Sequence, residues 1–314
     1  MDNFIFSVNV VLPIFLMIVL GSVLTGIGIL DEEMCAKLLR LVFYVSLPAS
    51  LFRSVAEADI REVMSPAFIS YAVGCTLLIF FLGWMICRLF FREKKQVAAA
   101  AHAAYRGNFA YVGIPVCQNL LGKENVPVTA AVIAFVVPVY NILAVLLLSH
   151  YDEEGGSGNI GKELLKILKN PLIIAIAAGI PFSFFRIPIA QPVMKTLAYI
   201  AQLASPLALL LIGANLNPAV LRSGWKGIAL TTLIKDVLSP LICTCGAVLL
   251  GFRGEELAVL FVMAAVPSAA NSYIMTRQMH GDAVLGAGAV AATSLFCIVS
   301  MTAGIMWMRS LGLV

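Results

Sequence analysis

Six long stretches of the chain contain no charged residue, and their length predicts helices that cross a membrane. A helix needs about 20 apolar residues to span the hydrocarbon layer of a bilayer. The stretches do not alternate apolar and polar positions as the strands of a membrane barrel do. They lie between charged residues at positions 2 and 31, 62 and 88, 124 and 152, 195 and 222, 256 and 277, and 282 and 309. The pattern therefore predicts six membrane-spanning helices.

Four further apolar stretches carry more polar residues but are also long enough to cross a bilayer. They cover 36–54, 97–121, 166–186 and 226–250. Arg106 interrupts the second of them, and Lys235 and Asp236 interrupt the fourth. Together the ten stretches predict an all-α membrane protein with ten transmembrane helices.

The predicted helices divide into two copies of one pattern. When residues 165–314 are displaced by 158 positions onto residues 1–150, three pairs of identical residues coincide. These pairs are Pro13 with Pro171, Gly21 with Gly179, and Pro48 with Pro206. Five helices per copy is an odd number, so the second repeat would enter the bilayer inverted relative to the first. Residues 151–164 form a short polar linker, which we expect in the cytoplasm.

The composition agrees with a membrane protein and excludes a soluble domain. The chain is 61% hydrophobic and 12% charged, with a mean hydropathy of +0.97, whereas soluble domains carry about 25% charged residues. Basic residues are more frequent on the side of the membrane opposite the N-terminus, which predicts that this side is cytoplasmic. We therefore expect a multi-pass protein of the inner or plasma membrane with both termini outside the cytoplasm. The net charge of +4 indicates no nucleic-acid partner.

The residue types that hold a metal or perform catalysis are not grouped in the sequence. The seven cysteines lie mostly within predicted helices and lack the spacing of metal ligands, so we expect neither a metal nor a cofactor. Asp236 is the one acidic residue well inside a predicted helix, which argues against an intramembrane enzyme with paired catalytic groups. Inverted repeats are instead a common architecture of secondary transporters.

The fourth predicted helix contains a motif that favours a break. Pro115 lacks the N–H that would bond the carbonyl four residues back, and its ring clashes with that carbonyl. Gly113 can leave helical dihedral angles, and Ile114 is disfavoured in a helix because a proline follows it. We therefore predict two half-helices that meet at Gly113–Pro115, with the donors and acceptors of Asn108 close to the break.

The ninth predicted helix carries a similar group of residues at the corresponding place in the second repeat. Pro267, Asn271 and Ser272 lie among small residues in the middle of the apolar stretch. A single proline often only kinks a membrane helix, and a single asparagine often bonds a neighbouring helix. Two interrupted helices at equivalent positions are the best indication of a transporter site in a sequence. We expect a substrate to bind where the two breaks meet.

Five further residues are candidates for the site or for coupling. Ser46 and Pro48 in the second predicted helix could line the site or form a close-packed surface between helices. Arg106 could attract an anion, or its side chain could extend to the cytoplasmic face. Lys235 and Asp236 lie near the centre of a predicted helix, where charged residues are costly and usually functional. All three charged residues are candidates for charge or proton coupling.

At the two breaks the sequence resembles the auxin efflux carrier family, which includes plant auxin exporters and bacterial carriers of malate and malonate. Asn108 followed by Gly113-Ile114-Pro115 matches an element of the family's fourth helix, and Pro267 matches a proline of its ninth helix. Asn271 stands where bacterial members often carry asparagine, whereas the second proline of plant members is absent. The resemblance implies two inverted five-helix repeats, a scaffold and a transport bundle, crossing helices four and nine, elevator-type movement, and a homodimer.

These observations lead to the hypothesis of a carrier that moves a small organic anion across the membrane. The substrate would be a mono- or dicarboxylate or an auxin-like acid, held at the breaks by helix N-termini and by Asn108 and Asn271. A sodium-coupled symporter of the bile-acid-carrier type is the alternative, because asparagine and serine oxygens at the breaks could bind sodium. Substrate identity, direction and coupling do not follow from the residues.

Overall fold

The computed structural model describes residues 13, 16–57, 66–121, 126–151, 169–215 and 224–314, and nearly all of them are helical. Within these described residues, five helices are long and apolar enough to cross a membrane: Glu32–Arg53, Pro66–Phe90, Gln191–Ala214, Trp225–Leu249 and Ala283–Ser310. Three shorter apolar helices cover Leu16–Gly26, Phe135–Tyr151 and Pro171–Phe184. The prediction of an all-α membrane protein is confirmed. The predicted linker at 151–164 lies, apart from Tyr151, outside the described residues.

In the part of the chain that the structure describes, three helices contain a π-helical turn, labelled η. After the helix Leu16–Gly26, the elements of the first half are α2 (Glu32–Leu41), η1 (Val42–Ser46), α3 (Leu47–Ala56), α4 (Pro66–Phe90), α5 (Lys94–Tyr105), η2 (Phe109–Gly113), α6 (Ile114–Leu121) and α7 (Val126–Tyr151). Those of the second half are α9 (Pro171–Phe184), α10 (Gln191–Gln202), α11 (Ala204–Asn215), α13 (Trp225–Leu233), η4 (Ile234–Leu238), α14 (Ser239–Leu249), α15 (Gly254–Ala265), α16 (Ala270–Gln278) and α17 (Ala283–Ser310).

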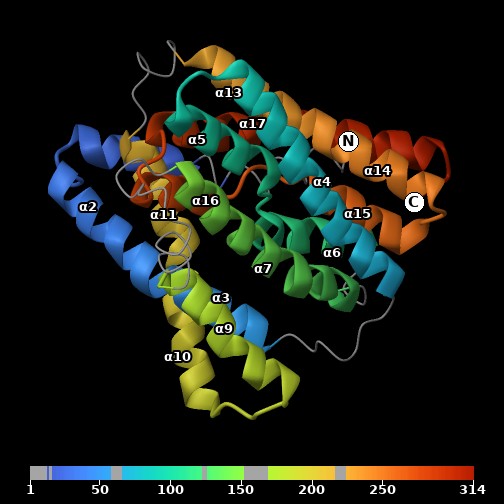
Figure 1. Cartoon of the computed structure of the whole chain (residues 1–314), viewed down its shortest axis with the longest axis horizontal. Coiled ribbons are helices and arrows are strands. Elements are labelled where there is room, and N and C mark those ends of the chain that lie inside the picture. Colours follow the sequence, from blue (N-terminus) through green and yellow to red (C-terminus); the bar gives the residue numbers. More distant parts are fainter. Residues whose placement is uncertain (1–12, 14–15, 58–65, 122–125, 152–168, 216–223) are drawn as a thin grey trace.

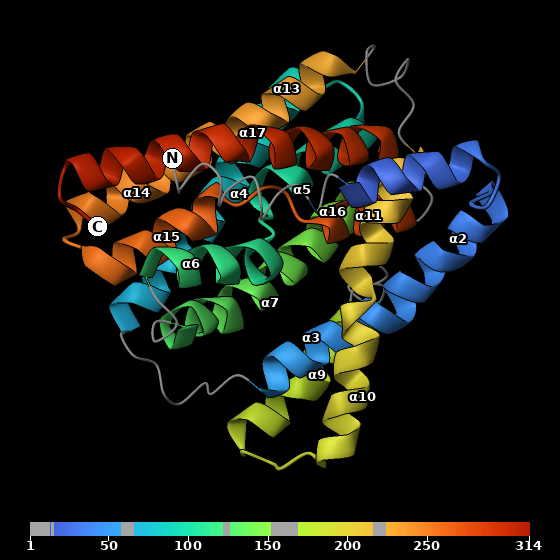
Figure 2. The same ribbon diagram turned by 180° about the vertical axis from the view of Figure 1, so that it is seen from behind.

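The helices form two groups (Figures 1 and 2). The smaller bundle contains α2, α3, α9, α10 and α11, together with η1 and the helix Leu16–Gly26. The larger bundle contains α4–α7 and α13–α17, with η2 and η4. The buried apolar residues form two clusters. One, with Phe68 and Leu260, lies within the larger bundle, and the other joins residues of the smaller bundle such as Leu172 to Leu148 of α7 and Tyr273 of α16. The two bundles therefore meet at a shared apolar interface.

Many large apolar side chains on the outer surface are exposed, as a lipid environment allows. Leu89 is 82% exposed, Leu249 is 86% exposed and Val299 is 61% exposed. A water-soluble protein rarely exposes contiguous apolar surface on this scale. The outer surface thus agrees with a protein embedded in a bilayer, where association of helices depends on close packing rather than on escape from water.

Each π-helical turn ends two residues before a proline. The prolines are Pro48 after η1, Pro115 after η2 and Pro240 after η4. A proline ring clashes with the carbonyl of the preceding turn and offers it no N–H donor. A single π-helical turn adds a residue to the helix at that point, which moves the carbonyl away from the ring. The proline can then stand near the start of the next α-helical segment without interrupting the helix.

This device explains why the predicted position of the first break was wrong. Ile114 has helical dihedral angles, with φ at −57° and ψ at −55°, so the chain stays helical through Gly113–Pro115. The helix is instead interrupted between α5 and η2, where Arg106 is extended, with φ at −83° and ψ at 100°. The proline motif therefore marks the first turns of the second half-helix, and the break precedes it.

Candidate substrate site

Two interrupted helices meet in a short antiparallel crossing inside the larger bundle. Gly107, between α5 and η2, pairs with Ser268, between α15 and α16. The amide of Asn108 donates to the carbonyl of Pro267 at 2.8 Å, and the amide of Ala269 donates to the carbonyl of Arg106 at 3.0 Å. The backbone groups that leave the helices are thus paired with each other, which satisfies them at a depth where unpaired backbone is costly.

Gly107 permits the close approach of the two extended segments. A Cβ atom at this position would lie 2.8 Å from Cγ2 of Val266, and 3.3 Å from both Nζ of Lys235 and the carbonyl oxygen of Met263. Any larger residue would push the segments apart and lengthen the backbone hydrogen bonds between them. Arg106 and Asn108 therefore lie on either side of a position that only glycine fits.

Side-chain donors cap the C-terminal ends of the first half-helices. The hydroxyl of Ser268 donates to the carbonyl of Ala103 in the last turn of α5 at 2.6 Å. The ammonium of Lys235 donates to the carbonyl of Ala264 in the last turn of α15 at 2.7 Å. The last carbonyls of a helix lack partners within it and carry partial negative charge. Lys235 thus acts as a buried cap for α15 behind the crossing.

We expect Ser268→Ala to lower the stability of the purified protein by about 1–3 kcal/mol, because the buried carbonyl of Ala103 would lose its donor. Thermal unfolding in detergent measures the effect. Ser310→Ala is a matched control, since the Ser310 hydroxyl also donates to a helix carbonyl, that of Trp307 at 2.8 Å, but on the exposed surface. Equal unfolding temperatures for Ser268→Ala and the wild type would contradict the capping role.

The N-terminal starts of the second half-helices border a cavity of about 260 Å³. It lies between the crossing, α7 and two helices of the smaller bundle, α3 and α10. The crossing contributes Arg106, Gly107, Asn108, Phe109, Ala269 and Asn271; α3, α7 and α10 contribute polar residues that include Ser50, Tyr140, Asn141 and Gln202. The first amides of a helix lack partners within it and carry partial positive charge. The cavity is therefore bordered by two helix ends that favour an anion.

Arg106 places a full positive charge at this cavity. Arg106 is only 4% exposed, and its guanidinium donates from Nη2 to Oδ1 of Asn141 at 2.7 Å. Nη1 lies 3.3 Å from Nε2 of His102 and 2.8 Å from Sδ of Met275. No carboxylate forms an ion pair with Arg106 in the described part of the chain. The side chain does not extend to the protein surface, and its charge is available to a bound anion.

The two asparagines of the crossing lie on the wall of the same cavity. Asn108 is 7% exposed, and Oδ1 of Asn271 is buried without a hydrogen-bond partner among the residues that the structure describes. Each amide group offers two N–H donors and one acceptor. An amide that the protein leaves unengaged can turn toward a ligand, so both residues can help to orient a carboxylate beside Arg106.

The other predicted site residues are not all brought to the cavity. Ile114 lines it, whereas Gly113 packs against the ring of Phe109. The hydroxyl of Ser272 donates to the carbonyl of Ala269 at 2.7 Å within the first turn of α16. Ser46 is buried in η1, and neither it nor Pro48 belongs to the cavity wall. The neighbouring residues Leu47 and Ser50 of α3 stand there instead.

Several residues that line the cavity were not predicted from the sequence. Asn141 is the clearest, because it holds the guanidinium of Arg106 and its own Nδ2 donates to the carbonyl of Val137 at 2.7 Å. An asparagine within a charge-free apolar stretch is a signal that could have identified it. Gln202 gives a similar signal, because it lies within the charge-free stretch between positions 195 and 222. Arg53 and Glu57, an ion pair on α3, also line the cavity.

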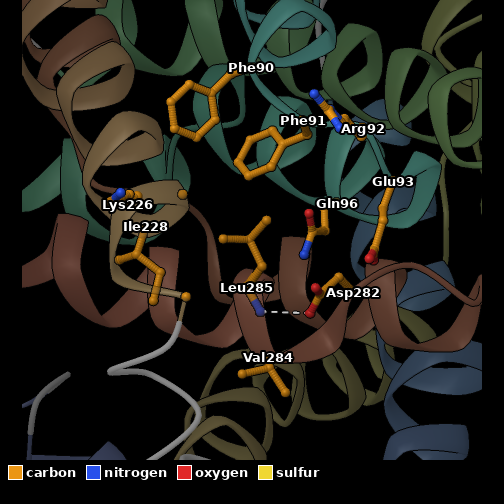
Figure 3. A pocket seen from close by; sticks show the side chains of 12 residues that line it. Phe90, Phe91, Arg92, Glu93, Gln96, Lys226, Ile228, Asp282, Val284 and Leu285 are labelled. Carbon is orange, nitrogen blue, oxygen red and sulfur yellow. Dashed lines mark hydrogen bonds between the residues drawn. The ribbon is translucent and has the colours of Figure 1, made fainter.

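Lys235 and Asp236 stand apart from this site. Lys235 donates to the carbonyl of Ala264 at the end of α15 and does not line the cavity at the crossing. Asp236 lines a different cavity between α14 and α17. A further cavity of about 540 Å³ lies where α4 ends and where α5, α13 and α17 begin (Figure 3). Its charged residues are of both signs, and Asp282 there caps α17 by accepting from the amide of Leu285 at 2.9 Å. Neither of these two cavities is lined by Arg106, which borders the cavity at the crossing.

Interrupted helices that cross beside a polar cavity in an apolar bundle are typical of membrane transporters. Comparison with known sequences agrees, because a family model described as "Membrane transport protein" matches residues 6–305. The chain therefore belongs to this family, and the resemblance to the auxin efflux carriers is confirmed.

Three relatives match almost end to end. An "Uncharacterized transporter" of Methanocaldococcus jannaschii is 23% identical over 299 residues, covering 92% of this chain and 95% of the relative. One of Methanothermobacter thermautotrophicus is 25% identical over 298 residues, covering 94% and 96%. A "Putative malonate transporter" of Rhizobium meliloti is 25% identical over 311 residues, covering 96% of both chains. The family and these names indicate a transporter rather than an enzyme.

Proposed function

We propose that the protein is a secondary carrier for a small organic anion, a mono- or dicarboxylate, and that the crossing holds the anion during transport. The observation that supports this most strongly is Arg106, a buried guanidinium without an acidic partner in the described residues, at a cavity bordered by two helix N-termini. A buried charge is costly unless it is paired. An anionic substrate supplies the missing partner.

In this proposal a carboxylate accepts charge-assisted hydrogen bonds from Arg106 and neutral ones from the amides of Asn108 and Asn271. The amides at the starts of η2 and α16 add a favourable electrostatic contribution. The cavity of about 260 Å³ is smaller than most small-molecule pockets, which measure roughly 300–1,000 Å³. A compact acid fits this volume, and malonate is a sensible first candidate because it appears in the name of one relative.

We propose that residues 1–150 and 165–314 are inverted five-helix repeats that together give ten membrane spans. Packing of the repeat-related glycines supports this. Gly21 lies against the backbone of Leu210 in α11, and Gly179 lies against Phe52 and Val55 in α3. The first helix of each repeat thus packs on the second helix of the other, as a two-fold relation requires. The distribution of basic residues supports an orientation with both termini outside the cytoplasm.

The position of the cavity supports an elevator-type movement. Its walls come from α3 and α10 in the smaller bundle and from α7 and the crossing in the larger bundle. Movement of the larger bundle along the smaller one would carry the crossing toward the other face of the membrane. The bound anion would travel with Arg106, because both belong to the moving unit. The smaller bundle would serve as the scaffold.

Uptake into proteoliposomes tests the function. We expect saturable uptake of at least one labelled mono- or dicarboxylate, and a decrease of about tenfold in Asn108→Ala and in Asn271→Ala, because a lost buried hydrogen bond costs about 1–3 kcal/mol. Gln191→Ala, which removes an exposed amide at the start of α10, is the control and should retain wild-type uptake. Full activity in both asparagine variants would contradict the assignment of the site.

The same preparation separates the proposal from its alternatives. Uptake that requires external sodium would identify a sodium-coupled symporter of the bile-acid-carrier type. Chemical conversion of the label, rather than its movement, would identify an intramembrane enzyme. Sodium-independent uptake of an unchanged anion is the result that the proposal predicts.

A further inference from the structure

Asp236 is a carboxyl group without a hydrogen-bond partner in the middle of an apolar helix. It lies in η4, within the apolar segment Trp225–Leu249, and is 1% exposed. Neither carboxyl oxygen accepts a hydrogen bond from any residue that the structure describes. A negative charge held in this way has a high free-energy cost inside a membrane protein, and groups of this kind commonly belong to ion or proton pathways. Binding of a proton removes that charge.

A cavity beside Asp236 contains two hydroxyl groups. Asp236 and Thr244 line one cavity of about 500 Å³, and Oγ1 of Thr244 also lacks a partner within the described residues. Ser300 of α17 adds another hydroxyl to the wall. A buried water molecule needs two to four polar partners. Most of the remaining wall is apolar, with Leu241 and Phe296 among its residues. A water molecule that carries a proton to Asp236 would therefore bind to the oxygens of Asp236, Thr244 and Ser300.

Lys235 connects Asp236 to the crossing. The titratable groups near Asp236 are Lys235 on its own turn and Cys297 on α17, and Cys243 on α14 lies near Lys235. In the structure the ammonium of Lys235 donates to the carbonyl of Ala264, one residue before α15 ends. An ionised Asp236 attracts this ammonium, and a protonated Asp236 does not. The cap on α15 is therefore sensitive to the proton on Asp236.

We propose that Asp236 is the binding site of a proton whose movement is coupled to anion transport, and that Lys235 transmits its protonation state to the crossing. This inference rests on the proposed carrier function. Asp236, Lys235 and the crossing all belong to the larger bundle, so a conformational step that moves the substrate site also moves the proton site. The proton site is nevertheless distinct from the substrate cavity, which Asp236 does not line.

The test is the accumulation of a labelled dicarboxylate in proteoliposomes with the membrane potential held at zero. One coupled proton and a gradient of one pH unit change the steady-state ratio of inside to outside anion by about tenfold. We expect this change for the wild type and none for Asp236→Asn, whose side chain has nearly the same shape. Exchange of labelled for unlabelled anion needs no net proton movement, so Asp236→Asn should retain it.

Asp31→Asn is the matched control, because it also removes one carboxylate but keeps the N-cap of α2 on the exposed surface. It should respond to the pH gradient like the wild type, and protein-free liposomes correct for passive entry of the protonated acid. A full pH response in Asp236→Asn would overturn the proposal, and so would loss of exchange together with the pH response. If the wild type itself transported no anion, the carrier function would fail rather than the proton site.

Discussion

Arg106→Gln is expected to lower the initial rate of anion uptake by about 100-fold or more. Removal of one partner from a buried, hydrogen-bonded charge pair costs about 2–5 kcal/mol, and each 1.4 kcal/mol corresponds to about a factor of ten. Arg106 is the charged residue of the crossing that lines the cavity, and its guanidinium is oriented by Asn141 at 2.7 Å. Glutamine keeps an N–H donor for Asn141 but offers no positive charge to the substrate.

The measurement is uptake at substrate concentrations below saturation, with the amount of folded protein checked by gel filtration. Arg106→Lys should retain part of the activity, because it keeps the charge but not the planar group that can hold Asn141 and a carboxylate together. Arg40→Gln, an exposed arginine in the last turn of α2, should behave like the wild type. Uptake by Arg106→Gln within a factor of three of the wild type would show that the anion binds elsewhere.

Gly213→Ala is expected to cause the largest loss of stability. A Cβ atom at Gly213 would lie 1.8 Å from the carbonyl oxygen of Ile18 and 2.8 Å from its carbonyl carbon, so α11 and the helix Leu16–Gly26 would have to separate. The hydroxyl of Ser22, which donates to the carbonyl of Gly213 at 2.7 Å, would be displaced too. Overpacking costs about 1–3 kcal/mol even where flexible side chains can adjust, and backbone atoms adjust less.

Gly74→Ala provides the matched control for this prediction. Gly74 lies inside α4, and nothing stands within 4 Å of a Cβ atom built there. Because alanine is favoured over glycine in a helix by about 1 kcal/mol, this variant should be as stable as the wild type or more stable. Thermal unfolding and expression yield measure both variants. Equal unfolding temperatures for Gly213→Ala and Gly74→Ala would show that the two helices do not cross in backbone contact.

The sequence predicted the fold class well because apolar length alone identifies helices in a membrane protein. The long charge-free stretches correspond to helices such as α4 and α17. The position of the first break was predicted wrongly, because η2 accommodates Pro115 within a continuous helix. A proline in an apolar stretch does not by itself show whether the helix breaks there or accommodates the ring with a π-helical turn. The true interruption at Arg106–Asn108 depends instead on pairing with the segment around Ser268, which only the assembled bundle provides.

The candidate site was predicted in part for the same reasons. Arg106, Asn108 and Asn271 are polar residues in otherwise apolar helices, and the structure brings all three to one cavity. Ser46 is also a polar residue in an apolar helix, but both it and Pro48 lie off the cavity, because the face of α3 that borders the cavity carries Leu47 and Ser50. Which face of a helix meets the cavity depends on tertiary packing. The position of Gln202 on the cavity wall therefore followed only from the packing of α10 in the structure.

Counterflow in proteoliposomes tests the central claim most directly. Vesicles are loaded with unlabelled malonate, or with the best substrate of the panel, and diluted into a trace of the labelled anion. A carrier that alternates one site between the two faces will accumulate label transiently above its equilibrium level, and Arg106→Gln will not. If the wild type takes up label only to equilibrium, or at the same rate as Arg106→Gln, the crossing is not the moving substrate site.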